Sequence, residues 1–180
     1  MRRIILLLTA FALCLSMAAC GSKAPTPTTP ADPNSVTITI PADLAGVQSD
    51  KDLKDQFSGE GYLDAVLTED GSVVLTMTRE KHTALIADTE LSIRESLDIL
   101  VAGEDNRFTK IEVDEAYTHY TVYLPAEELQ LSERFYSVSF VFSSGLYYVV
   151  LGQETPEVTV DYVNELTGET IYTYPEPAQG

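Results

Sequence analysis

The chain has 180 residues and is strongly acidic, with 11 Lys and Arg residues against 28 Asp and Glu residues and a net charge of −17 at pH 7. Such a charge repels polyanions, so the composition excludes a nucleic-acid partner. The two cysteines, Cys14 and Cys20, both lie near the N-terminus, so neither a disulfide framework nor a cysteine-rich zinc site is expected in the rest of the chain.

The first 19 residues have the layout of an export signal. Arg2 and Arg3 precede an apolar run over residues 4–19, which ends in small residues. About 20 apolar residues are needed to cross a bilayer, so an uncleaved transmembrane anchor is the weaker alternative.

The end of this run, Leu15-Ser16-Met17-Ala18-Ala19-Cys20, resembles the lipobox of bacterial lipoproteins. In a lipobox the cysteine is diacylated on sulfur and the preceding peptide bond is cut. The resemblance implies a signal peptide over residues 1–19 and a lipid on Cys20. We therefore expect the mature protein on the extracytoplasmic face of the cell membrane, anchored through that lipid.

Three further segments are expected after the signal. Residues 20–34 are predicted to be a lipidated tether because prolines interrupt small polar residues. A single globular domain over residues 35–175 and a short flexible tail over 176–180 follow. Cys14 leaves with the signal and Cys20 carries the lipid, so the domain has no thiol and must be stabilised by its own core. Without Arg2 and Arg3 the charge balance is 9 against 28, or −19.

The first half of the domain predicts a strand, short helices, a hairpin and a long helix. Residues 36–40 alternate as a strand that ends at Pro41, a helix starts over 41–44, and a second short helix covers 50–57. Strands 62–68 and 72–78 form a hairpin around Glu69-Asp70-Gly71, with Leu63, Ala65 and Leu67 pointing inward. The helix over residues 79–102 has one apolar stripe and ends at Gly103. That stripe consists of Ile86, Ile93, Leu97 and Leu100.

The second half predicts two hairpins with an ambiguous segment between them. Residues 107–113 and 118–124 pair around Asp114-Glu115-Ala116, and residues 158–163 and 170–174 pair at the C-terminus. Between them, residues 126–152 fit two structures. Val138, Phe140 and Phe142 alternate as in a strand, but a helical stripe is also present, consisting of Phe135, Val138, Phe142, Leu146 and Val149.

A weak internal repeat favours the helix. Residues 39–43 (TIPAD), 76–80 (TMTRE) and 123–127 (YLPAE) each combine a strand exit with an acidic helix start. The order is therefore expected to be β-α-ββ-α-ββ-α-ββ, with residues 126–152 as the third helix. This order predicts an α+β fold, a mainly antiparallel sheet with about three helices packed on it.

Five short segments carry a further resemblance that spans the domain. They are residues 36–42 (VTITIPA), 69–73 (EDGSV), 81–82 (KH), 108–111 (FTKI) and 165–169 (ELTGE). In these segments the chain resembles a family of uncharacterised lipoproteins of Gram-positive bacteria. The resemblance implies a helical third segment, and it implies no activity, substrate or site residue.

Few residues suggest chemistry. The two histidines, His82 and His119, are expected to be a hydrogen-bonded helix-end residue and a strand-surface residue, and no zinc-ligand spacing or cofactor motif occurs. Tyrosines crowd the last third of the domain, a residue type favoured at interfaces but also common on strands. The candidate binding face consists of Tyr117, His119, Tyr120 and Tyr123.

The sequence thus favours a non-enzymatic module that binds a protein, peptide or envelope component. A hydrolase with paired carboxylates and a structural or inhibitor-like spacer domain remain open as alternatives.

Overall fold

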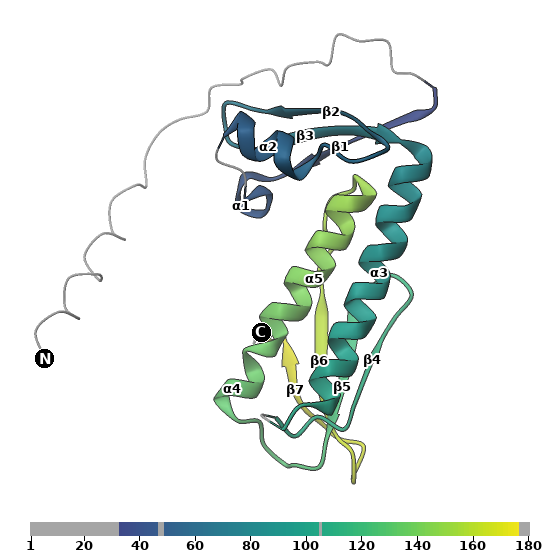
Figure 1. The fold of residues 1–180 in the computed structure, drawn as a ribbon. Helices are drawn as coiled ribbons and strands as arrows, with labels where there is room; N and C mark the ends of the chain where they lie inside the picture. The colour runs from purple at the N-terminus through teal and green to yellow at the C-terminus, as the bar shows by residue number, and fades with distance from the viewer. Residues whose placement is uncertain (1–32, 47–48, 105, 177–180) are drawn as a thin grey trace, which may run out of the picture. The chain divides into compact units, whose positions relative to one another are not determined.

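The computed structural model describes residues 33–46, 49–104 and 106–176, so the signal, Cys20 and most of the tether lie outside the described residues. The elements follow the expected order of strand, helices and hairpins, and the α+β class is confirmed (Figure 1). They are β1 (Ser35–Ile40), α1 (Ala42–Ala45), α2 (Asp50–Gln56), β2 (Tyr62–Leu67), β3 (Val73–Thr78), α3 (Arg79–Ala102), β4 (Lys110–Val113), β5 (His119–Leu124), α4 (Leu131–Arg134), α5 (Tyr136–Leu151), β6 (Thr159–Asn164) and β7 (Thr170–Tyr174). Within these ranges, no helix combines the length and apolar character needed to cross a bilayer.

The strands divide between two sheets, whereas the sequence suggested one. The first sheet has the antiparallel order β1-β3-β2, and the second has the order β4-β5-β6-β7 with β5 and β6 parallel. A helix of 24 residues such as α3 is about 36 Å long. The chain therefore begins β4 far from β3 and starts a new sheet there.

The first sheet has its own small core. Every second residue of β3 is buried, and Val73, Leu75 and Met77 pack against Ile38 of β1 and Leu53 of α2. Leu63 was expected to point inward but is 54% exposed. The reason is a bulge in β2 between Tyr62 and Asp64, which interrupts the alternation of side chains.

The larger core lies under two long helices. α3 and α5 lie side by side over one face of the second sheet and run in opposite directions (Figure 1). Ile93 and Leu97 of α3 are buried, as their place in the predicted stripe requires, and Ile86 and Leu100 pack beside them. The sheet contributes Tyr120, Val122, Leu124, Val160 and Tyr162 to this core.

A helix is confirmed over most of residues 126–152, as α4 and α5, but residues 126–130 are a loop and the predicted buried face is wrong. Phe135, Val138, Phe142 and Leu146 are exposed, by 65%, 56%, 56% and 39% respectively. The buried residues of α5 are instead Ser137, Phe140, Ser144, Tyr147 and Val150. The helix is therefore turned so that much of its apolar stripe faces outward.

Candidate interaction surface

The structure divides the four candidate binding residues between two environments. Side chains of β5 alternate, so Tyr120 faces the helices and is 0% exposed, while His119 and Tyr123 lie on the opposite face of the sheet. Tyr117 precedes the strand at φ 55° and is 1% exposed, with its ring 4.7 Å from that of Tyr147. Tyr117 and Tyr120 are therefore core residues, and only His119 and Tyr123 reach the surface.

The sheet face that carries His119 and Tyr123 has its polar groups paired across strands. His119 Nε2 lies 2.9 Å from Asp161 Oδ2, and Tyr123 Oη donates to Glu112 at 2.8 Å. This hydrogen bond to Glu112 raises the pKa of Tyr123. Thr173 donates its hydroxyl to Asp161 and not to His119, so the three side chains do not form a nucleophile–base pair.

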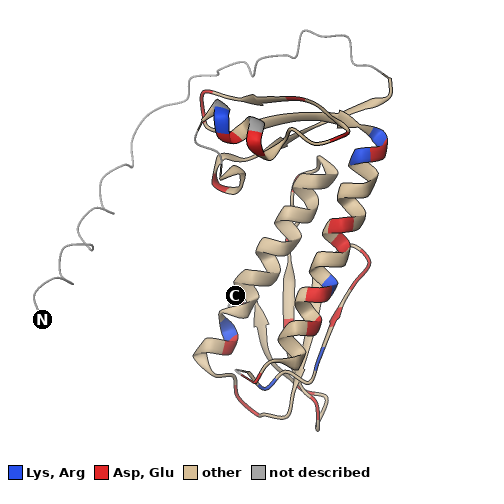
Figure 2. Cartoon of the chain, viewed as in Figure 1, with Lys and Arg blue, Asp and Glu red and all other residues tan. Residues whose placement is uncertain are grey.

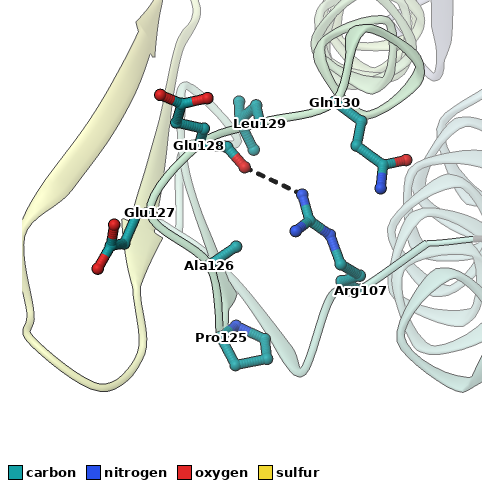
Figure 3. A pocket seen from close by; sticks show the side chains of 7 residues that line it. All are labelled: Arg107, Pro125, Ala126, Glu127, Glu128, Leu129 and Gln130. Atoms are coloured by element: carbon teal, nitrogen blue, oxygen red, sulfur yellow. Dashed lines mark hydrogen bonds between the residues drawn. The ribbon is translucent and has the colours of Figure 1, made fainter.

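A second group surrounds Arg107, which together with the loop over residues 125–130 lines an open hollow of about 480 Å³ (Figure 3). Arg107 donates from Nε and Nη2 to both carboxylate oxygens of Glu133, at 2.8 and 2.6 Å, and from Nη2 to the carbonyl of Glu128. Hydrogen bonding from Arg107 lowers the pKa of Glu133, although burial opposes this shift. Glu133 also accepts from the backbone N–H of Gln130 at the start of α4.

This arrangement is a structural clamp. Glu133 is 1% exposed. Its buried charge is compensated by the bidentate ion pair with Arg107 and by the hydrogen bond that caps α4. The carboxylates of Glu127 and Glu128 point away from the Arg107 guanidinium (Figure 3). The hollow therefore does not present the facing carboxylates that a glycosidase-like site requires.

The other candidate groups also have structural partners. His82 Nε2 lies 2.7 Å from the carbonyl oxygen of Val150, which confirms it as a hydrogen-bonded helix-end residue. In the described part of the chain, no three His, Cys, Asp or Glu side chains are grouped in a way that could hold a metal ion.

Two tyrosines of the second sheet are buried in the core with their hydroxyl groups within hydrogen-bonding distance of serine hydroxyls of α5. Tyr120 Oη lies 3.0 Å from Ser144 Oγ, and Tyr162 Oη lies 2.9 Å from Ser137 Oγ. Burial raises the pKa of Tyr162 to about 12. Among the described side chains, the buried oxygen without a partner is Tyr117 Oη. Ser137 and Ser144 of α5 are thus used inside the domain, whereas Ser139 is exposed and Ser143 is half-buried.

The outward side of α5 is the feature that the core does not explain. We define the α5 outer face as Phe135, the N-cap residue of α5, together with Val138, Phe142 and Leu146, which continue the same line along the helix. No residue of α5 is charged, whereas α3 beside it carries charges of both signs (Figure 2). Surface helices normally place charged or polar residues on this side.

A groove of about 310 Å³ adjoins the outer face, between α5 and α3. Phe142 and Leu146 form its wall on α5, and Leu85 forms part of its wall on α3. Ser92 and Ser96 of α3 also line it, together with Asp88. The groove and the outer face share Phe142 and Leu146, and the polar residues Ser139 and Ser143 lie among these apolar side chains.

Sequence reasoning missed this surface, although the sequence contains a signal for it. Residues 136–151 include no Asp, Glu, Lys or Arg. A helix of that composition on a sheet has no charged side to turn to solvent, so it must either be covered on all sides or expose apolar residues.

Comparisons with protein-family models, curated proteins and solved structures gave no match.

Proposed function

We propose that this protein is a lipid-anchored, non-enzymatic binding module on the extracytoplasmic face of the cell membrane. The likeness of residues 15–20 to a lipobox supports the anchor, with Cys20 as the lipidated residue. The exposed apolar surface of α5 supports the binding role. A partner protein or peptide of the cell envelope is the proposed class of ligand.

The observation that carries the binding role is the exposure of two phenylalanines, one at the N-cap of α5 and one within it. Phe135 and Phe142 are 65% and 56% exposed and lie on the same side of α5 as Val138 and Leu146. Single exposed apolar residues are common, but contiguous apolar surface on a soluble domain usually marks an interaction site. Aromatic residues of this kind also supply much of the binding energy at interfaces.

The anchor is tested by Cys20→Ser. The protein with this change is expected to move from the membrane fraction to the soluble extracytoplasmic fraction, because no diacylglyceryl group can be attached. Fractionation of cells with an antibody to the domain measures this. Membrane retention of a Cys20→Ser protein from which residues 1–19 have been removed would contradict the anchor.

The binding role is tested by a photo-crosslinking amino acid at position 142 in intact cells. The matched control position is Leu166, an apolar residue that is 80% exposed in the turn between β6 and β7. We expect a defined crosslinked product from position 142 and none of the same mass from position 166. Equal labelling from both positions, or none from position 142, would contradict a binding role for α5.

A further inference from the structure

We propose that the groove between α3 and α5 takes an amphipathic helix of a partner protein, with basic residues beside its apolar face. This inference rests on the proposed function and specifies the chemistry of the ligand.

The shape of the surface suits a helix. Two antiparallel helices create a groove along their line of contact, and an apolar helix face fits such a groove with anchors at i, i+3, i+4 and i+7. The α5 outer face extends from Phe135 to Leu146, which corresponds to about 16 Å or three helical turns. On α3, Ser92 and Ser96 line the groove with small side chains, so a third helix can approach α3 closely.

The charge of the groove selects a cationic ligand. Asp88 lines it, and Glu95 lies two turns further along the same side of α3 and is exposed. In the described part of the chain neither carboxylate forms an ion pair, and the groove lining includes no Lys or Arg. The basic residue of α3 near this level, Arg94, lies 5.8 Å from the ring centroid of Tyr117 on the other side of the helix.

Charge and area disfavour a second copy of this chain as the ligand. A symmetric contact that covers the groove of both copies would place Asp88 and Glu95 of each copy in one interface, where like charges are unfavourable. From the size of aromatic side chains, the four outer-face residues offer about 400 Å² per copy. A stable dimer usually needs about 800 Å² per partner.

Charge also disfavours a lipid surface. Anionic lipids attract basic segments. This chain has a net charge of −17, and Asp88 lines the groove, so an anionic lipid surface would be repelled.

The test measures peptide binding to the full chain with Cys20→Ser, purified without detergent. The probe is a fluorescent helical peptide of about 18 residues, with leucines on one face and lysines beside them. Two matched peptides replace every lysine by glutamate or scramble the order of residues. Fluorescence anisotropy is expected to show binding of the lysine peptide, at least about tenfold weaker binding of the other two, and weakening with added salt.

Variants of the chain locate the binding site. Phe142→Ser is expected to weaken binding about tenfold or more, whereas Leu166→Ser leaves it unchanged. Asp88→Asn with Glu95→Gln is expected to weaken binding about fivefold and to reduce its salt dependence. The charge-matched control is Glu165→Gln with Glu169→Gln, two exposed acids at the β6–β7 turn. Equal losses in the two double variants would show attraction to net charge alone and would overturn the proposal.

Other occupants give different outcomes. Two results would overturn the proposal of a cationic helical partner. One is sedimentation that shows a dimer which Phe142→Ser abolishes, and the other is flotation of the protein with vesicles of equal parts phosphatidylcholine and phosphatidylglycerol.

The partner segment crosslinked from position 142 in cells is sequenced by mass spectrometry. A basic amphipathic segment supports the inference, and an acidic or non-helical one refutes it while leaving the binding role intact. Absence of any crosslink refutes both.

Discussion

The orientation of α5 can be tested by truncating two phenylalanines that lie two positions apart. Phe140 is 2% exposed, and its ring stacks on that of Tyr120 with centroids 5.0 Å apart. Truncation of a buried Phe to Ala costs about 3 to 5 kcal/mol, so Phe140→Ala should cost about 4 kcal/mol. Phe142 is 56% exposed. Full burial of a Phe stabilises by about 1.5 to 3 kcal/mol, so Phe142→Ala should cost about 1 kcal/mol.

Urea unfolding followed by far-UV circular dichroism measures both effects. With a slope of about 2 kcal/mol per molar urea, Phe140→Ala should lower the midpoint by roughly 2 M and Phe142→Ala by about 0.5 M. Each variant is the other's control, because both remove the same side chain from the same helix. Equal losses, or a greater loss for Phe142→Ala, would show that the apolar stripe packs on the sheet and would remove the basis for the interaction surface.

Three other changes test the structure elsewhere. Gly145→Ala should stabilise by about 0.5 to 1 kcal/mol in thermal melts, since Gly145 lies within α5 and its added Cβ would meet only Thr155 Oγ1 at 3.8 Å; a marked loss would contradict the helix. Glu133→Ala should cost about 2 kcal/mol because it removes the bidentate partner of Arg107, whose side chain is 37% exposed so that solvent compensates part of the loss. The lowered pKa of Glu133 means that this stability is present above about pH 4.5 and is lost as the pH falls further, so urea midpoints below pH 4.5 should fall more steeply for the wild type than for Glu133→Gln. Tyr117→Phe should leave the melting temperature unchanged or raise it, because the removed hydroxyl is buried without a partner.

The elements could be predicted because residues with strong local effects mark their ends. Pro41 follows β1, and Gly71, at φ 85°, turns the first hairpin where Asp70-Gly71 predicted a tight turn. Gly103 caps α3 at the predicted position. The β-rich composition of residues 136–151 would have predicted a strand, and the repeat of strand exits correctly overruled it. Packing on a sheet stabilises a helix of weak intrinsic propensity.

The candidate binding face could not be predicted from tyrosine content, because neighbouring residues of a strand point to opposite faces. Tyr120 and His119 are adjacent in sequence, yet one is in the core and the other on the outer sheet face. The alternation of β5 was visible, since Tyr120, Val122 and Leu124 share one face. Tyr117 is a different case, because its burial depends on contacts with α5 that no local pattern records.

The tyrosines of the sheet beneath α5 determine which side of the helix faces inward. Tyr120 and Tyr162 point their hydroxyls at the helix, and a buried hydroxyl without a hydrogen bond costs about 1 to 3 kcal/mol. Ser144 and Ser137 meet those hydroxyls only when they face inward, and Phe140 then stacks on Tyr120. Phe142, about 160° around the helix from Phe140 by helical geometry, is consequently placed outside. The core therefore uses Ser137 and Ser144 of α5 and leaves Phe135 and Phe142 at the surface. The exposed positions of these two large apolar side chains support the proposed contact with a ligand.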